Sequence, residues 1–133
     1  MKVFRVLSAV FLFLFFGLKC QQNPYREGAR LYQVHCANCH MDDGAGLSAL
    51  IPPLAGSGFL KTHRERLPCI LKYGLKDTIQ VNGKQYAEQM PGVPTLSAVH
   101  ITNILNYIQT SWGNQEQPFR LDDVEALLEA CKR

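Results

Sequence analysis

The sequence lacks a hydrophobic run long enough to cross a membrane as a helix. Its longest apolar run, from Val6 to Leu18, contains Ser8 and Gly17 and is shorter than the roughly 18–20 residues that a spanning helix requires. Internal repeats and low-complexity tracts are also absent. The length that remains after this run suits a single folded domain.

An excess of charge is missing as well. Three of the fourteen basic residues lie within the first twenty positions, and the eleven that remain equal the eleven acidic residues. The net charge of +3 for the whole chain therefore gives no argument for nucleic-acid binding, which needs a basic surface.

The first twenty residues are typical of an export segment. Lys2 and Arg5 supply a positive start, the apolar run follows, and Cys20 stands where the run ends. A cysteine at this place predicts a lipoprotein in which Cys20 is acylated and anchors the protein to a membrane. The three residues before it depart from the usual small-residue lipidation motif, so an ordinary signal peptide that leaves Cys20 as a free thiol stays open. We expect residues 1–20 to be the signal segment and residues 21–133 one exported domain, periplasmic or lipid-anchored.

The pentapeptide Cys36-Ala37-Asn38-Cys39-His40 is the attachment motif of a c-type haem. It predicts one haem c, covalently bound through the thiols of Cys36 and Cys39, with His40 as an axial ligand of the iron. A thiol oxidoreductase is the first alternative, but its reactive pair opens a helix, whereas these cysteines are expected to close one. A zinc site would need a second, closely spaced Cys/His pair, and the sequence has none.

Methionine is scarce, and this scarcity narrows the choice of a second axial ligand. Met1 leaves with the signal, and Met41 follows His40 on the same side of the ring. Met90, about fifty residues downstream, lies in a segment that Pro91 and Pro94 stiffen. We predict that the Met90 thioether ligates the iron; the alternative is that Met90 fills the core.

Three histidines and an open position compete with Met90. His35 adjoins the haem cysteines, and His63 and His100 lie in segments expected to form helix surfaces. A haem peroxidase or gas sensor would keep the distal position open or labile, and a peroxidase would also need acid/base groups. Only Glu88 is close to Met90 in sequence.

Two further cysteines, Cys69 and Cys131, remain after these assignments. In an exported chain such thiols tend to pair. We predict a Cys69–Cys131 disulfide; the alternative is two separate buried cysteines.

Local patterns predict four or five short helices and one β-hairpin. The hairpin is expected around Asn82-Gly83, because an Asn-Gly pair favours a tight two-residue turn. Ser97 is expected to cap a helix whose apolar positions repeat at helical spacing as far as Trp112, with Gly113 ending it. Further helices are expected from Pro24 to the haem cysteines, over Phe59–Arg66, over Pro68–Tyr73, and over Leu121–Lys132 with Asp122 as cap.

The chain resembles the small bacterial monohaem cytochromes c of class I over roughly residues 25–112. The resemblance rests on the pentapeptide, on Pro52-Pro53-Leu54-Ala55-Gly56, on Met90-Pro91 and on Leu105-Asn106-Tyr107-Ile108. It implies an all-α cytochrome c fold around one covalent haem, with the hairpin and the C-terminal helix from about residue 121 as additions. It also implies an electron carrier, not an enzyme, with His40 and Met90 as ligands and redox proteins of a respiratory chain as partners.

Two structural details follow from the resemblance alone. The family places a proline carbonyl twelve residues after the haem histidine, as acceptor for the imidazole, and this position is Pro52. The family also crosses its first and last core helices at a small residue and an aromatic one, which implies Gly28 and Tyr32 against Leu105 and Ile108.

Basic residues gather between positions 61 and 84. They outnumber the acidic residues Glu65 and Asp77, and this stretch is expected either to be a solvated face or to dock an acidic redox partner. The basic residues are Lys61, Arg64, Arg66, Lys72, Lys76 and Lys84.

Overall fold

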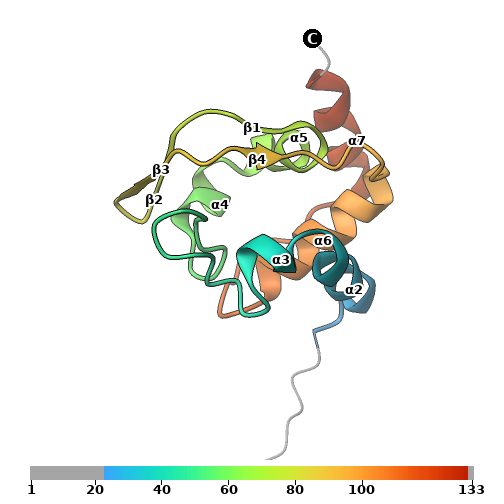
Figure 1. The fold of residues 1–133 in the computed structure, drawn as a ribbon. Coiled ribbons are helices and arrows are strands. Elements are labelled where there is room, and N and C mark those ends of the chain that lie inside the picture. The colour runs from blue at the N-terminus through green and yellow to red at the C-terminus, as the bar shows by residue number, and fades with distance from the viewer. Residues whose placement is uncertain (1–22, 132–133) are drawn as a thin grey trace, which may run out of the picture.

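The computed structural model describes residues 23–131. The expected export segment and Cys20 lie outside these residues. Within them lie six α-helices, one 3₁₀ helix and four short strands (Figure 1). None of these helices is long and apolar enough to cross a membrane. The predicted mainly helical fold with a small hairpin is confirmed.

Helices α2 (Arg26–His35) and α6 (Ala98–Thr110) cross in close contact. Gly28 permits this, because a Cβ atom there would overlap the Asn103 carbonyl and lie 2.8 Å from Tyr107 Cβ. The crossing therefore uses Asn103 and Tyr107, and the expectation of Leu105 and Ile108 was wrong. Those two residues lie on another face of α6 and border the cavity described below.

Helix α6 begins as predicted, since Ser97 Oγ accepts a hydrogen bond from the His100 amide at 3.2 Å. Its end differs from the prediction, because the helix stops at Thr110 and Trp112 has a positive φ of 53°. This turn brings the indole back to Tyr32, with ring centroids 5.1 Å apart, and Trp112 Nε1 donates to the Asp42 carbonyl at 3.1 Å. Tertiary packing thus overrides the helical periodicity at this position.

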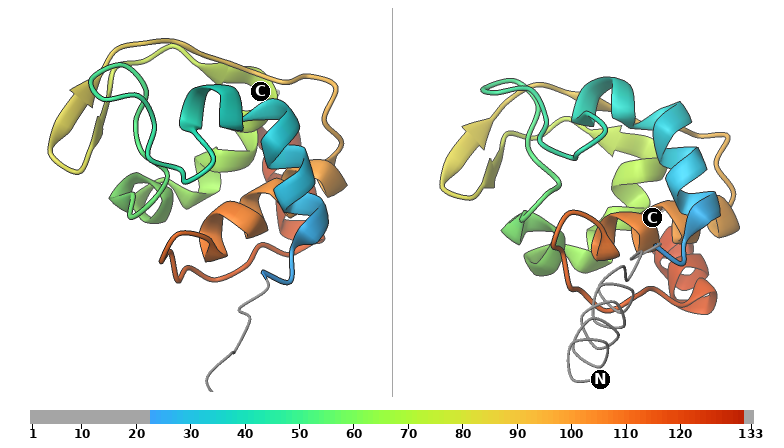
Figure 2. Two further views of the ribbon diagram at one scale, coloured as in Figure 1. Left: turned by 60° about the horizontal axis from the view of Figure 1, so that its bottom comes forward. Right: turned by 90° about the horizontal axis from the view of Figure 1, so that it is seen from below.

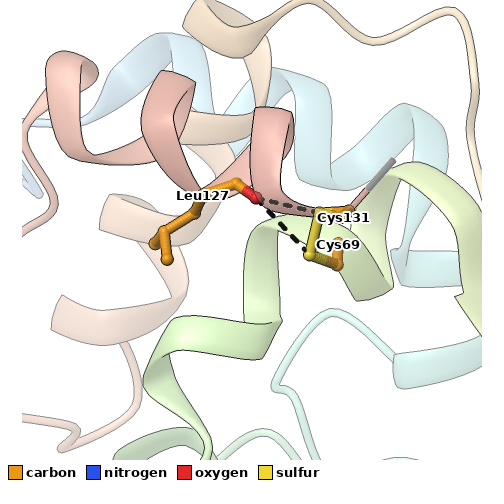
Figure 3. The surroundings of a disulfide bond; sticks show 3 residues. All are labelled: Cys69, Leu127 and Cys131. Carbon is orange, nitrogen blue, oxygen red and sulfur yellow. Dashed lines mark hydrogen bonds between the residues drawn. A yellow bond between two sulfur atoms is a disulfide. The ribbon is translucent and has the colours of Figure 1, made fainter. Parts of the chain in front are cut away.

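Helix α7 (Leu121–Ala130) packs against α5 (Leu67–Tyr73) and α6. A disulfide joins Cys69 to Cys131, as predicted, with Cα atoms 5.8 Å apart (Figure 3). Both sulfur atoms lie near the Leu127 carbonyl oxygen, at 3.8 and 3.1 Å; because disulfide sulfur carries no proton, we regard these as packing contacts. The expected Asp122 cap was wrong: Arg120 precedes the helix and pairs with Asp122 in its first turn.

Two short segments replace the single helix that was predicted over residues 59–66. They are α4 (Gly58–Thr62) and the 3₁₀ helix η1 (Arg64–Arg66). His63 interrupts the helix between them, and its ring stacks on Phe59 with centroids 4.0 Å apart.

The strands form two antiparallel pairs. The predicted hairpin joins β2 (Ile79–Val81) to β3 (Lys84–Tyr86), with positive φ at Asn82 and Gly83, and it projects at one end of the molecule (Figure 2). The second pair, β1 (Gly74–Leu75) with β4 (Met90–Pro91), was not expected. It connects the end of α5 to the segment that carries Met90.

Candidate haem-binding site

The two motif cysteines lie one helical turn apart at the junction of two helices. Cys36 ends α2, with its amide donating to the Tyr32 carbonyl at 2.8 Å, and α3 (Ala37–His40) begins immediately after it. The His40 amide donates to the Cys36 carbonyl at 2.9 Å. Cys36 is half-buried and Cys39 exposed, so the pair stands at the rim of the interior.

His40 is buried, and its Nδ1 lies 3.1 Å from the Pro52 carbonyl oxygen. A carbonyl can only accept, so Nδ1 carries the proton and Nε2 keeps a free lone pair. Burial lowers the pKa of His40, and its hydrogen bond to Pro52 opposes this only in part. The imidazole therefore stays neutral, which is the form that ligates metals.

The loop after α3 brings Pro52 to this position. Gly46 approaches it so closely that a Cβ atom there would lie 2.7 Å from the Pro52 carbonyl oxygen, and its positive φ of 69° also favours glycine. The start of the loop is held by the Tyr32 hydroxyl, which donates to the Met41 carbonyl at 2.7 Å. The acceptor is thus Pro52, as the resemblance implied, and not Pro53.

An apolar cavity lies between His40 and Met90, and three adjoining hollows compose it. His40 and Met90 border all three, Cys36 borders two and Cys39 borders two. In Figure 1, α3, which carries His40, and β4, which carries Met90, lie opposite each other. Most other lining side chains are aliphatic or aromatic and include Leu54, Phe59, Leu60, Leu67, Ile70, Leu71, Leu75, Ile79, Val81, Leu105 and Ile108.

Close backbone packing sets the position of Met90. In the β1–β4 pair, Met90 lies opposite Leu75 and Pro91 opposite Gly74. A Cβ atom on Gly74 would overlap the Met90 carbonyl, and one on Gly92 would lie 2.5 Å from the Gly74 nitrogen. Two glycines therefore let the Met90 segment lie directly against the end of α5, and larger residues would move it away.

The chemistry of these residues fits a haem c. Two thiols stand at the rim, a neutral imidazole faces the interior, and a thioether lies on the far side of an apolar cavity. Thiols for covalent attachment, a nitrogen donor and a sulfur donor are what a c-type haem with two axial ligands requires.

The geometry gives no support to the thiol and zinc alternatives. Burial raises the pKa of the Cys36 thiol to about 12, the opposite of the lowering that activates a redox thiol. Among residues 23–131, no group of three or more His, Cys, Asp or Glu side chains could hold a metal ion.

The competing histidines are placed apart from the distal side. His35 lies at the cavity rim beside Cys36, and His63 stacks on Phe59. His100 is exposed near the start of α6. Of the competitors, only His35 touches the cavity, and it does so from the side of the cysteines.

Sequence reasoning missed the residues that support Met90. It expected a helix over Pro68–Tyr73 to end before Gly74, treated Lys72 only as a solvated or docking charge, and gave Gly92 no role. One available signal was the presence of glycines at positions 74 and 92, because glycine permits a close approach of backbone segments. Without the β1–β4 pairing, nothing connected the two positions.

The chain is similar to known proteins over much of its length. Residues 25–112 match the family model described as cytochrome c. The chain is 36% identical over 110 residues to cytochrome c-552 of Thermus thermophilus, covering 76% of this chain and 83% of that protein. It is also 38% identical over 92 residues to the cytochrome c subunit of a quinone alcohol dehydrogenase of Gluconacetobacter polyoxogenes, covering 66% of this chain but 19% of that subunit.

Proposed function

The chain belongs to the cytochrome c family, and from this premise we propose that it carries one haem c, bound through Cys36 and Cys39, with His40 and Met90 as axial ligands. Proteins of this family transfer electrons, and the chain is an electron carrier and not an enzyme.

One observation carries the proposal. His40 and Met90 both border each of the three hollows that compose the apolar cavity, although fifty residues separate them in sequence. A core-filling methionine would need no histidine beside the same empty space. This shared border favours the reading of the two residues as a ligand pair.

Each residue then has a separate task. The haem supplies the one-electron Fe(II)/Fe(III) couple. The Pro52 carbonyl orients His40 by accepting from Nδ1. The neutral thioether of Met90 favours the reduced iron more than a second imidazole would. The aliphatic walls would exclude water from the bound group.

Absorption spectroscopy of the holoprotein tests the ligand set. Thioether ligation gives ferric haem a weak far-red charge-transfer band, and we expect this band in the wild type and its loss in Met90→Ala. Leu54→Ala, which alters the cavity wall without a ligand, is the control and should keep the band. A high-spin ferric spectrum in the wild type, or rapid carbon monoxide binding to its reduced form, would contradict Met90 ligation. Such a result would favour the peroxidase or gas-sensor alternative.

We further propose that the partners are redox proteins of a respiratory chain. The relatives named as dehydrogenase subunits support a place beside, or within, such a complex. Lys61 and Lys76 are exposed and are the basic residues best suited to steer an acidic partner. Reversing both charges should slow electron transfer at low ionic strength, and an unchanged rate would remove these two lysines from the docking surface.

Membrane attachment through Cys20 is also a proposal. Replacement of Cys20 by serine should release the protein into the soluble periplasmic fraction if the cysteine is lipidated. An unchanged distribution between the membrane and soluble fractions would instead favour an ordinary signal peptide.

A further inference from the structure

Lys72 makes contacts that a solvated or docking charge would not make. It lies in the last turn of α5 and is half-buried. Its Nζ donates to the carbonyl oxygens of Pro94 and Leu96, each at 2.6 Å. None of the salt bridges formed by residues 23–131 involves it. The ammonium group is therefore engaged with the backbone of another segment and not with a carboxylate.

That segment begins with Met90. We name residues 90–96 the Met90 strap. Apart from Lys72, it contacts the end of α5 and the start of β1 at three places: the β1–β4 pair, the close approach of Gly92 to the backbone of residues 72–74, and the Val93 amide, which donates to the Leu71 carbonyl at 2.9 Å. The strap ends at Leu96, whose side chain is buried in the core.

The contacts divide the strap into two parts. Its first half, over residues 90–93, is paired through backbone groups. Its second half contains Pro94, which has no amide hydrogen to donate, so backbone pairing cannot continue unbroken through it. The Lys72 ammonium binds the carbonyls of Pro94 and Leu96 and thereby joins this second half to α5. Hydrogen bonds from a charged donor are stronger than those between neutral groups.

We propose that Lys72 is a positioning residue for the distal ligand: its two hydrogen bonds to the Met90 strap keep the strap closed over the cavity and so keep Met90 sulfur at the iron. The inference rests on the proposed function, because it presumes that Met90 ligates the iron. It assigns Lys72 to the site itself and removes it from the set of docking charges.

Imidazole binding to the ferric holoprotein measures how often the strap opens. Added imidazole can reach the iron only in molecules in which Met90 has left it, so the apparent affinity scales with the open fraction. Lys72→Met keeps the length of the side chain and removes the donors. Hydrogen bonds from a charged donor are among the stronger ones in proteins, so their loss should raise the imidazole affinity about tenfold, which corresponds to about 1.4 kcal/mol.

Lys76→Met is the matched control. Lys76 lies four residues away, is exposed, and makes no hydrogen bond or salt bridge recorded among residues 23–131. Lys76→Met loses the same positive charge as Lys72→Met but no contact with the strap. The imidazole affinity of Lys76→Met should therefore stay within about twofold of wild type. Lys72→Arg, which restores donors and charge, should recover much of the wild-type affinity. If Lys72→Met yields no holoprotein, Lys72→Gln replaces it, and its imidazole affinity should then exceed that of Lys76→Met.

The outcomes distinguish the positioning role of Lys72 from the ligation of the iron by Met90. An affinity in Lys72→Met equal to that of Lys76→Met would overturn the positioning role, even if Lys72→Met unfolds at a lower temperature, because a merely structural residue gives that pattern. A wild type without the far-red band would overturn Met90 ligation and the positioning role together. The band in the wild type, with a selective rise in imidazole affinity in Lys72→Met, would support both.

Discussion

The two sides of the cavity are built in different ways. On the His40 side, the attachment cysteines, the histidine and its Pro52 acceptor all come from one stretch of seventeen residues, 36–52, linked by short-range hydrogen bonds. On the Met90 side, the methionine depends on α5 and β1, which lie about fifteen residues earlier, and on the Lys72 contacts. Contacts within one stretch of the chain hold most of the first side, to which Trp112 adds a tertiary contact at Asp42, whereas contacts between separate segments hold the second.

This difference has a consequence for dynamics. Local opening begins where few buried contacts and few hydrogen bonds hold a segment. The strap crosses the surface with Pro91 and Pro94 exposed, whereas His40 is buried and directly follows Cys39, one of the two proposed attachment cysteines. We therefore expect the Met90 side to open first under mild stress, with His40 still in place. The variants below test this order.

The largest effect should come from the attachment cysteines. In Cys36→Ser/Cys39→Ser, no thioether bond can form, so the chain should carry no covalent haem after denaturing electrophoresis. Because haem surface would fill the apolar cavity, the exported chain should also be poorly folded. Cys69→Ser/Cys131→Ser removes the same number of thiols elsewhere and should keep covalent haem. Covalent haem in the first double variant would contradict the site.

The disulfide belongs to the Met90 side, since it ties α5 to α7 across 62 residues of sequence (Figure 3). Removing it in Cys69→Ser/Cys131→Ser should lower the free energy of unfolding by about 2–4 kcal/mol. Denaturant titration of the holoprotein, followed by the far-red band and by far-ultraviolet circular dichroism, measures this. The band should vanish at a lower denaturant concentration than the helical signal. Coincident transitions would argue against early opening of the Met90 side.

A matched pair of glycine variants separates the two sides directly. Gly28→Ala would press on Asn103 at the helix crossing, and Gly92→Ala would press on the backbone at the end of α5. Because the added methyl group overpacks its surroundings, each substitution should lower the free energy of unfolding by about 1–3 kcal/mol. Gly92→Ala should raise the imidazole affinity of the folded protein, whereas Gly28→Ala should lower only the thermal midpoint. If Gly92→Ala and Gly28→Ala had equal imidazole affinities, the strap would not open independently of the helix crossing.

Tyr32→Phe should have a smaller effect, confined to the His40 side. The variant loses the hydrogen bond from the buried hydroxyl to Met41, a loss of about 1 kcal/mol. Burial raises the pKa of Tyr32, so the hydroxyl stays protonated and the loss should not depend on pH in the neutral range. Thermal unfolding at several pH values checks this, with the exposed Tyr73→Phe as control. A change in imidazole affinity would show that the two sides are coupled.

The smallest effect should come from Glu27→Gln on the outer face of α2. The hydrogen bond from Arg30 holds the pKa of Glu27 below its ordinary value of 4.5. A carboxyl group whose pKa is lowered in the folded state stabilises the protein at pH values above its ordinary pKa. This contribution is lost as the pH falls through the folded-state pKa. The pair is exposed, so the thermal midpoint of Glu27→Gln should differ little from wild type at neutral pH and not at all in acid. A large difference would show a role for α2 beyond its buried face.

Much of the His40 side could be predicted from sequence because its signals are local. The pentapeptide indicated the haem cysteines, and a count of twelve residues, taken from the family resemblance, indicated Pro52. The Asn82-Gly83 turn and the Ser97 cap were read correctly for the same reason, since both depend on neighbours within four residues. The pairing of Cys69 with Cys131 was reached by elimination among five cysteines and the expectation of an oxidising compartment.

The errors arose where distant residues compete with a local pattern. Trp112 continues the apolar spacing of α6, yet its ring is drawn out of the helix toward Tyr32 and Asp42. The Asp122 error is instead local: Arg120, two residues earlier, precedes the helix and pairs with the Asp122 carboxylate. The helix crossing was placed on the wrong face of α6, because sequence spacing alone does not say which face turns toward the cavity.

By itself, the sequence determined the chemistry: which residues could attach a haem, which atoms could ligate iron, and which segments would be helical. Only the tertiary structure decided how Met90, the proposed second ligand, is held, through β1, two glycines and Lys72. The physical reason is distance along the chain. A pattern within one turn or one helix specifies its own geometry, whereas contacts between segments depend on the packing of the whole core.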